Sequence, residues 1–134
     1  MSPDPPSGAL TTSSVVVQQT DPPSTFVAPT QACLAVRPVS CQHVDLSHVD
    51  LAGAKLADAN LRGVDLTDAS LIDAHLLSAD LTGANLTRAN LLFADLTGVT
   101  LIDAYLSSAN LTGALVREAN LNGARLDDVI GYDS

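Results

Sequence analysis

Hydrophobic residues recur every five positions over most of the chain. Leucine occupies every fifth position from Leu46 to Leu126, with Val116 as the one substitution, and Ala or Val stands two residues before each of them. A step of five residues rotates an α-helix by roughly 140°, so the leucines would be scattered around its cylinder. In a flat strand the odd step would send successive leucines to opposite faces. The backbone must therefore turn within every unit if all the leucines point inward.

Each unit assigns a role to its five positions, counted from the leucine at position i. The residue at i−2 shares the inward face with the leucine, at the spacing of an extended segment. The residue at i−1 points outward and is mostly Asp or Asn, while i+1 and i+2 form a corner. Several units carry glycine at i+2, where freedom of φ favours a turn: Gly53, Gly63, Gly83, Gly98, Gly113 and Gly123.

Units such as Ala84–Arg88 (A-N-L-T-R) and Ala109–Gly113 (A-N-L-T-G) repeat the pattern A-[D/N]-L-x-x from Val44 to Asp128. This pattern closely resembles the pentapeptide repeat family. The resemblance implies an all-β fold, a right-handed quadrilateral β-helix (a solenoid) with four units to a coil and about four coils. At the ~4.8 Å spacing of neighbouring strands the rod would be roughly 20 Å tall. Its core would be the column Leu46, Leu51, Leu56, Leu61, Leu66, Leu71, Leu76, Leu81, Leu86, Leu91, Leu96, Leu101, Leu106, Leu111, Val116, Leu121 and Leu126.

The composition changes sharply near residue 39, because all 7 prolines precede it. Residues 1–30 are rich in Pro, Ser and Thr and predict a disordered or extended tail. Residues 31–43 are expected to form an N-terminal cap or first partial coil, since a solenoid must shield the ends of its core. The repeat domain spans 44–128, and residues 129–134 leave the strict pattern and are expected to cap the last coil.

Two cysteines, Cys33 and Cys41, lie in the expected cap. Cys41 occupies an i position and is interpreted as a small core residue, and a disulfide is not favoured because no secretory signal precedes it. The spacing offers no second pair of metal ligands. The short Val15–Val17 run is too brief for a membrane span. These features predict a soluble cytoplasmic protein of bacterial origin.

The formal net charge of −9 disfavours direct binding of DNA or RNA and permits a basic protein partner. With four units to a coil, Arg88 would lie beside Asp68 and could pair with it. His75 would lie next to Asp95, but no nucleophile shares their column. His43 and His48 lie at adjacent corners, where their side chains should diverge rather than share a metal. We therefore expect no enzyme activity and no catalytic residue, cofactor or metal site.

Seven apolar residues lie outside the inward positions: Ile72, Leu77, Leu92, Phe93, Ile102, Tyr105 and Leu115. In steps of twenty, Ala52, Ile72 and Leu92 form one corner column, and Phe93 lies beside it. Contiguous exposed apolar surface often marks a protein interface, although aliphatic ladders that merely stack between coils would explain the same residues. The candidate interface comprises Ala52, Ile72, Leu92, Phe93, Leu77, Ile130 and Tyr132.

These features favour a non-enzymatic β-helical scaffold that binds a protein partner through the apolar column or a terminal cap, without membrane contact. A homodimer through the C-terminal cap or the apolar side is left open. The alternative comes from one branch of the family, acidic rods that mimic DNA, bind DNA gyrase or topoisomerase IV and confer toxin or quinolone resistance. Those rods are usually longer, often carry Phe at i and tend to have projecting loops, whereas this run has Leu at i and no loops.

Overall fold

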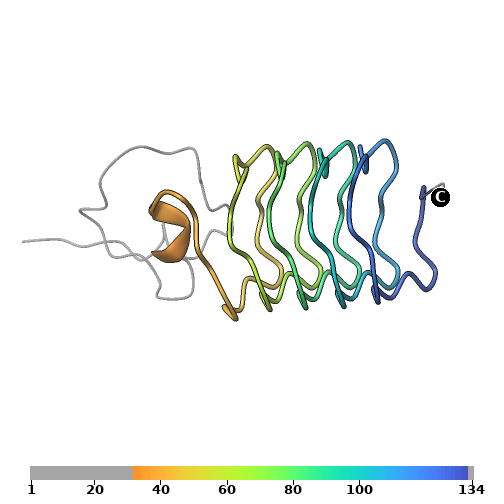
Figure 1. Cartoon of the computed structure of the whole chain (residues 1–134), viewed down its shortest axis with the longest axis horizontal. Helices are drawn as coiled ribbons and strands as arrows, with labels where there is room; N and C mark the ends of the chain where they lie inside the picture. The colour runs from red at the N-terminus through yellow and green to blue at the C-terminus, as the bar shows by residue number, and fades with distance from the viewer. Residues whose placement is uncertain (1–31, 133–134) are drawn as a thin grey trace, which may run out of the picture.

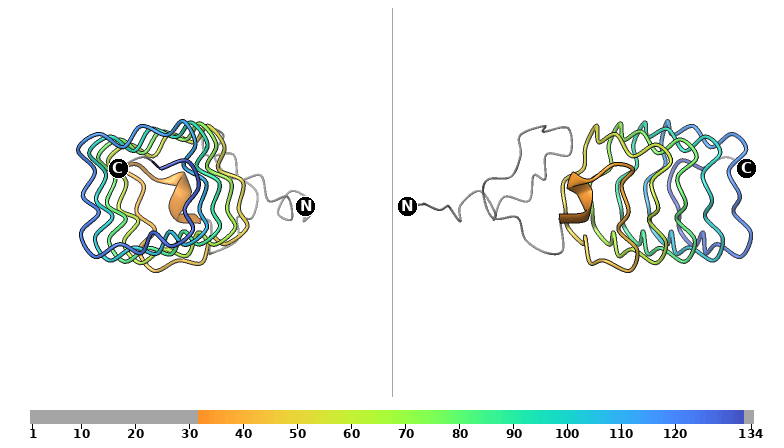
Figure 2. Two further views of the ribbon diagram at one scale, coloured as in Figure 1. Left: turned by 90° about the vertical axis from the view of Figure 1, so that its right-hand side faces the viewer. Right: turned by 60° about the vertical axis from the view of Figure 1, so that its left-hand side comes forward.

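The computed structural model describes residues 32–132, so the predicted tail (1–30) lies outside the described residues. The described chain is a rod of stacked coils, and a short 3-10 helix, η1 (Cys33–Ala35), lies at its N-terminal end (Figure 1). Viewed down the rod, the coils have a four-sided outline (Figure 2). The right-handed sense of the coil stays a prediction.

Residues twenty apart pair in parallel around the whole rod. The pairs join i−1 positions and run from Ser40↔Asn60 to Asn110↔Ile130, so four units complete one coil and residues 40–130 make about four and a half coils. These contacts are isolated bridges and not continuous strands, because each extended segment turns after three residues. The all-β expectation is met in this reduced form.

Inter-coil hydrogen bonds use most of the backbone donors of a repeat unit. The N–H groups at i and i+2 donate to the next coil, and the N–H at i−1 donates to the previous one. The N–H at i−2 closes the turn onto the carbonyl of the preceding leucine. In the unit centred on Leu86 these distances lie between 2.6 and 2.9 Å. Unpaired buried backbone groups are costly, so this ladder explains why every unit repeats one backbone geometry.

The corner position i+2 has a positive φ in every unit from His43 to Asp128, with values between 57° and 74°. Glycine fills only six of these positions, and the others hold residues with a side chain. A positive φ at the third residue is what a type II turn requires. Because left-handed backbone costs a non-glycine residue roughly 1–2 kcal/mol, the inter-coil hydrogen bonds impose this geometry against local preference.

The core is a stack of leucines with Ala or Val beside them. From Leu46 to Leu111 every leucine at i is at most 3% exposed. Val116, Leu121 and Leu126 are only partly buried, which corrects their placement as fully formed core. They belong to the last coil, which no further described coil covers. At this end Val129 and Tyr132 pack against the core.

The N-terminal end is covered by the segment around η1. Leu34 and Val39 are 2% and 3% exposed, but Val36 is 54% exposed, so only part of the apolar sequence of this segment serves as cover. Cys33 and Cys41 form a disulfide with their Cα atoms 5.2 Å apart. This pairing, which the sequence left open and did not favour, is present in the structure. The chain folds back across the first coil after η1 and brings together two residues 8 positions apart, a return that no repeat pattern predicts.

Candidate functional site

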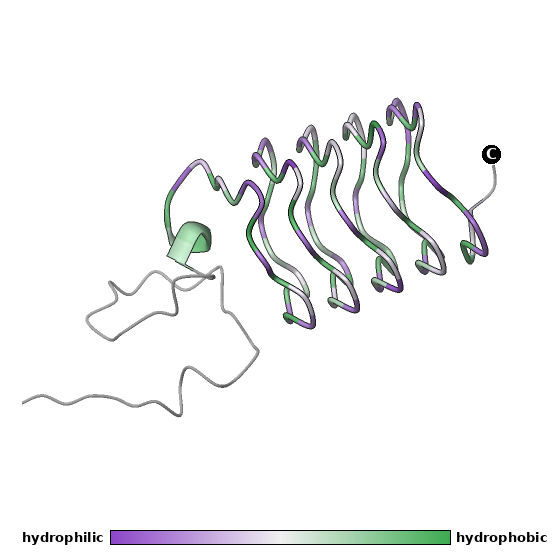
Figure 3. Ribbon diagram, turned by 90° about the horizontal axis from the view of Figure 1, so that it is seen from below, coloured by the Kyte–Doolittle hydropathy of each residue, from purple (hydrophilic) through white to green (hydrophobic). Residues whose placement is uncertain are grey.

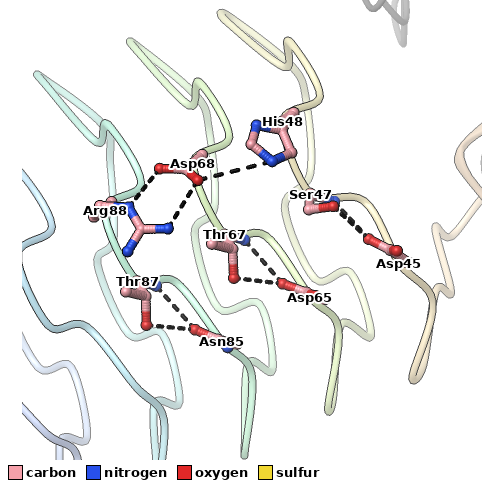
Figure 4. Close-up of polar contacts among 9 residues, drawn as sticks. All are labelled: Asp45, Ser47, His48, Asp65, Thr67, Asp68, Asn85, Thr87 and Arg88. Carbon is pink, nitrogen blue, oxygen red and sulfur yellow. Dashed lines mark hydrogen bonds and ion pairs between the residues drawn. The ribbon is translucent and has the colours of Figure 1, made fainter.

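The Asp and Asn residues at i−1 have a structural task. Each accepts a hydrogen bond at Oδ1 from the N–H at i+1, as at Asp65 and Asn85, where the distances are 3.0 Å. The hydroxyls of Thr67 and Thr87 donate to the same oxygens at 2.6 Å (Figure 4). This bond satisfies the one backbone donor that the inter-coil ladder and the turn leave over. The Asp and Asn side chains at i−1 therefore serve as acceptors for backbone N–H groups.

Asp68 lies between two basic side chains on one corner of the rod (Figure 4). The guanidinium of Arg88 donates to its carboxylate at 2.8 and 3.0 Å, and Nε2 of His48 lies 3.8 Å away. The hydrogen bond from Arg88, joined by its charge, lowers the pKa of Asp68. The pairing of Arg88 with Asp68 that the twenty-residue step predicts is confirmed. Because the pair is exposed, it stabilises the fold little.

His75 and Asp95 are bridged neighbours in one column. Hydrogen bonds from the hydroxyl and N–H of Thr97 lower the pKa of Asp95, and the charges of His75 and Arg117 add to this effect. A lowered pKa makes Asp95 a poorer proton acceptor, the opposite of what a general base needs. The Asp95 carboxylate is instead engaged as the acceptor of the Thr97 N–H and hydroxyl.

Within residues 32–132, no group of three His, Cys, Asp or Glu side chains is arranged to hold a metal ion. None of the polar or charged side chains described is buried. The same part of the chain contains no helix with the length and apolar character needed to cross a membrane.

Three exposed hydrophobic side chains lie on one side of the rod, whereas Tyr105 and Ile130, which are also exposed, lie in other columns. Leu77, Phe93 and Leu115 are 42%, 57% and 48% exposed, and Ile72 and Leu92 are half-buried beside them. We call these five residues the apolar face.

Hydrogen bonds and bridges between coils hold the apolar face together. The N–H of Asp73 donates to the carbonyl of Leu92 at 2.9 Å, which sets the Ile72 corner against the Leu92 corner. Asp95 bridges to Leu115 in the column of the adjoining side.

Phe93 is the most exposed member of the apolar face, and a glycine makes its position possible. A Cβ atom at Gly113 would clash with the Phe93 ring. The ring therefore lies over the Gly113 corner of the next coil, on the side that carries Leu115. Around every coil, hydrophilic and hydrophobic stretches alternate (Figure 3).

The structure places some residues of the predicted interface away from the apolar face, and it adds Leu115 to that face. Ala52 is exposed in the same corner column as Ile72. Ile130 is 55% exposed but pairs with Asn110 in another column, and Tyr132 packs against the core at the C-terminal end. Leu115 was left out of the predicted interface. The twenty-residue columns could have identified Leu115, because its column adjoins the corner that carries Leu92 and Phe93.

Comparisons with known proteins agree with this architecture. The family model for pentapeptide repeats matches 8 copies, over residues 39–71, 65–101 and 101–130. The crystal structure of the pentapeptide repeat protein Rfr23 from the cyanobacterium Cyanothece 51142 is 33% identical, with 72% of this chain and 67% of that chain covered and a TM-score of 0.69. A search among curated proteins found no match.

Two further solved structures share the fold. A pentapeptide repeat protein from the Arabidopsis thaliana thylakoid lumen is 32% identical, with 60% of this chain and 56% of that chain covered and a TM-score of 0.58. QnrB1, a plasmid-mediated fluoroquinolone resistance protein, is 18% identical, with 56% of this chain and 39% of that chain covered and a TM-score of 0.54. At that identity the likeness concerns the fold alone. The repeated units, the twenty-residue coil and the family model together show that the chain belongs to the pentapeptide repeat family.

Proposed function

We propose that this protein is a non-enzymatic scaffold that binds a protein partner through the apolar face. The observation that carries this proposal is the gathering of Leu77, Phe93 and Leu115 on one side of a rod whose i−1 and corner positions are mostly polar. Apolar side chains at these positions are not needed for the fold, because other units build the same backbone with Thr, Ser or Asp there. Clustered apolar surface of this kind is typical of a protein interface.

Polar side chains lie among the residues of the apolar face. His75 and Asp95 share the column of Leu115 between its corners, and Asp73 stands next to Ile72. Protein–protein interfaces combine apolar and polar side chains. Phe93 is the best candidate for the residue that contributes most binding free energy, because large aromatic side chains dominate such contacts.

Mimicry of DNA is the competing proposal, and it rests on the net charge of −9. A DNA mimic needs a broad field of negative charge. Here Arg88 neutralises Asp68, and Arg62 lies 3.1 Å from Asp80. These pairs interrupt the acidic surface, so the charge pattern supports the scaffold proposal better than mimicry of DNA.

The two proposals separate in a binding experiment with matched variants. The tagged protein is used to capture partners from a lysate of its source organism, and purified gyrase is assayed for supercoiling at rising concentrations of the protein. The double variant Ile72→Asp, Leu92→Asp places charges in the apolar face. Ile102→Asp is the control, because it makes the same change at an i+1 corner on another side of the rod.

We expect the wild type and Ile102→Asp to retain one partner that the double variant loses, with circular dichroism unchanged in all three. A charge in an apolar contact is strongly unfavourable unless it is paired. Loss of the partner in Ile102→Asp to the same extent would refute the role of the apolar face. Inhibition of gyrase that disappears in Asp65→Asn, Asp80→Asn and persists in the Ile72/Leu92 variant would establish mimicry of DNA instead.

A further inference from the structure

The N-terminal cap is joined covalently to the first coil. Helix η1 lies across the opening of that coil (Figure 2). Its Leu34 is 2% exposed and packs in the same core cluster as Cys41, which is 0% exposed. The bond between Cys33 and Cys41 therefore connects the cap to the innermost layer of the core.

The hydrogen-bonded ladder of the solenoid begins after the cap. Its first inter-coil bonds join the carbonyl of Val39 to the N–H of Asn60 at 2.9 Å and the N–H of Cys41 to the carbonyl of Asn60 at 2.8 Å. Between η1 and this ladder, residues 35–38 are exposed. The cap is thus a small lid outside the repeating hydrogen-bond pattern, and both buried Leu34 and the disulfide join it to the core.

We propose that the Cys33–Cys41 disulfide is a redox latch that keeps this lid closed over the first coil, a property independent of the proposed partner binding. Cys33 is half-buried and Cys41 is fully buried, so in the proposed reduction a dithiol attacks Sγ of Cys33, the less buried of the two sulfurs. Its thiolate forms a mixed disulfide with Cys33, and the Cys41 sulfur leaves and takes up a proton. The second thiol of the reductant then displaces Cys33. Two electrons and two protons pass to the protein, and the reductant becomes a disulfide.

Opening the latch changes the end of the rod and leaves its middle intact. Cys41 stands at an i position and, as a thiol, remains a small apolar residue suited to the core. The lid then lacks its covalent bond to the core, and its detachment uncovers Val39, Cys41 and Leu46. Terminal units of a solenoid have a neighbour on one side only, so loss of the cap loosens the first coil before any other. The latch stays closed under oxidising conditions and opens in a reducing cytoplasm.

Hydrogen exchange of the full chain, followed by mass spectrometry with and without dithiothreitol, tests the latch. The reporter is the segment 39–46, and the internal control is the segment 86–111. On reduction we expect exchange to become at least tenfold faster in the reporter and to stay unchanged in the control. Cys33→Ser should exchange like the reduced protein under both conditions, because it keeps Cys41 in the core and removes the bond.

Two results would overturn the proposal. One is equal exchange of the segment 39–46 in the oxidised and reduced protein, which would show that the lid stays closed without the bond. The other is a count of two free thiols after treatment with an oxidised dithiol, which would show that the bond does not form. If Cys33→Ser fails to fold, reduction and reoxidation of the wild type give the same comparison without a substitution.

Discussion

Replacing Leu86 by alanine tests whether the leucine column is the main source of stability. Leu86 lies in the middle of the rod and is 1% exposed, with buried leucines of the same column in the coils on either side. The substitution removes buried carbon atoms and leaves a cavity that two hydrogen-bonded coils cannot close. Buried Leu→Ala changes cost about 2–5 kcal/mol, and the rigid ladder places this site near 3 kcal/mol or above. For an ordered region of this size, that loss lowers Tm by about 12–24 °C.

Two matched variants serve as controls for Leu86→Ala. Leu121→Ala makes the same change at the same repeat position in the last coil, where the side chain is only partly buried. We expect it to cost about half as much, because less apolar surface leaves water on folding. Thr87→Ala, next to Leu86, removes a hydroxyl that donates to Asn85 Oδ1 at 2.6 Å and should cost about 0.5–1 kcal/mol. Thermal and urea melts measure all three, and equal losses at Leu86 and Thr87 would refute the inward assignment of position i.

Three further predictions concern the turns. Thr100→Asn should raise the free energy of unfolding by about 0.5–1 kcal/mol, because it supplies the i+1 N–H of its unit with the acceptor that Thr100 does not provide; a denaturant melt with no gain would contradict the role assigned to i−1. Asp95→Asn keeps an oxygen that can accept the Thr97 N–H but removes the ionisable group. In the wild type the pKa of Asp95 is lowered by the fold, so the stability that its ionisation gives at neutral pH is lost as pH falls below about 4. Melts at pH 7 and pH 3 should therefore differ less in this variant than in the wild type. Gly83→Ala has open space around the new Cβ and should cost about 1 kcal/mol for its positive φ, while Gly113→Ala must also displace the Phe93 ring and should cost more; equal losses would show that the ring is free to move away.

The sequence predicted those features that follow from strict repetition. Leucine at every fifth residue required inward positions and corners, and the twenty-residue columns placed Arg88 beside Asp68, where the structure has an ion pair. The hydrogen bond made by the Asp or Asn side chain at i−1 was not predicted, although the preference for these residues is plain in the sequence. Its purpose emerges only when the backbone donors of a unit are counted, because the N–H at i+1 is the one that the ladder and the turn leave over.

Features that break the repeat could not be predicted in the same way. The Cys33–Cys41 bond depends on the path of a non-repeating segment that folds back across the first coil. The partial exposure of Leu121 and Leu126 depends on where the described stack stops. The membership of Leu115 in the apolar face depends on which columns are adjacent around a corner, a property of the closed coil and not of any linear pattern.

The same accounting explains why the fold is easier to derive than the function. The four backbone N–H groups at i−2, i−1, i and i+2 of a mid-rod unit bond to other backbone groups whatever its surface residues are, and the i and i−2 side chains fill the core. The side chains at i−1, i+1 and i+2 do not fill the core and differ from unit to unit, as the presence of Gly, Asp, Arg or Phe at corners of similar φ shows. A partner that binds the side of the rod would therefore contact side chains at those three positions. Phe93 occupies one of them with a large aromatic ring over a glycine, an arrangement that the repeat allows but does not require, and so it is the first position to substitute in a test of the proposed partner binding.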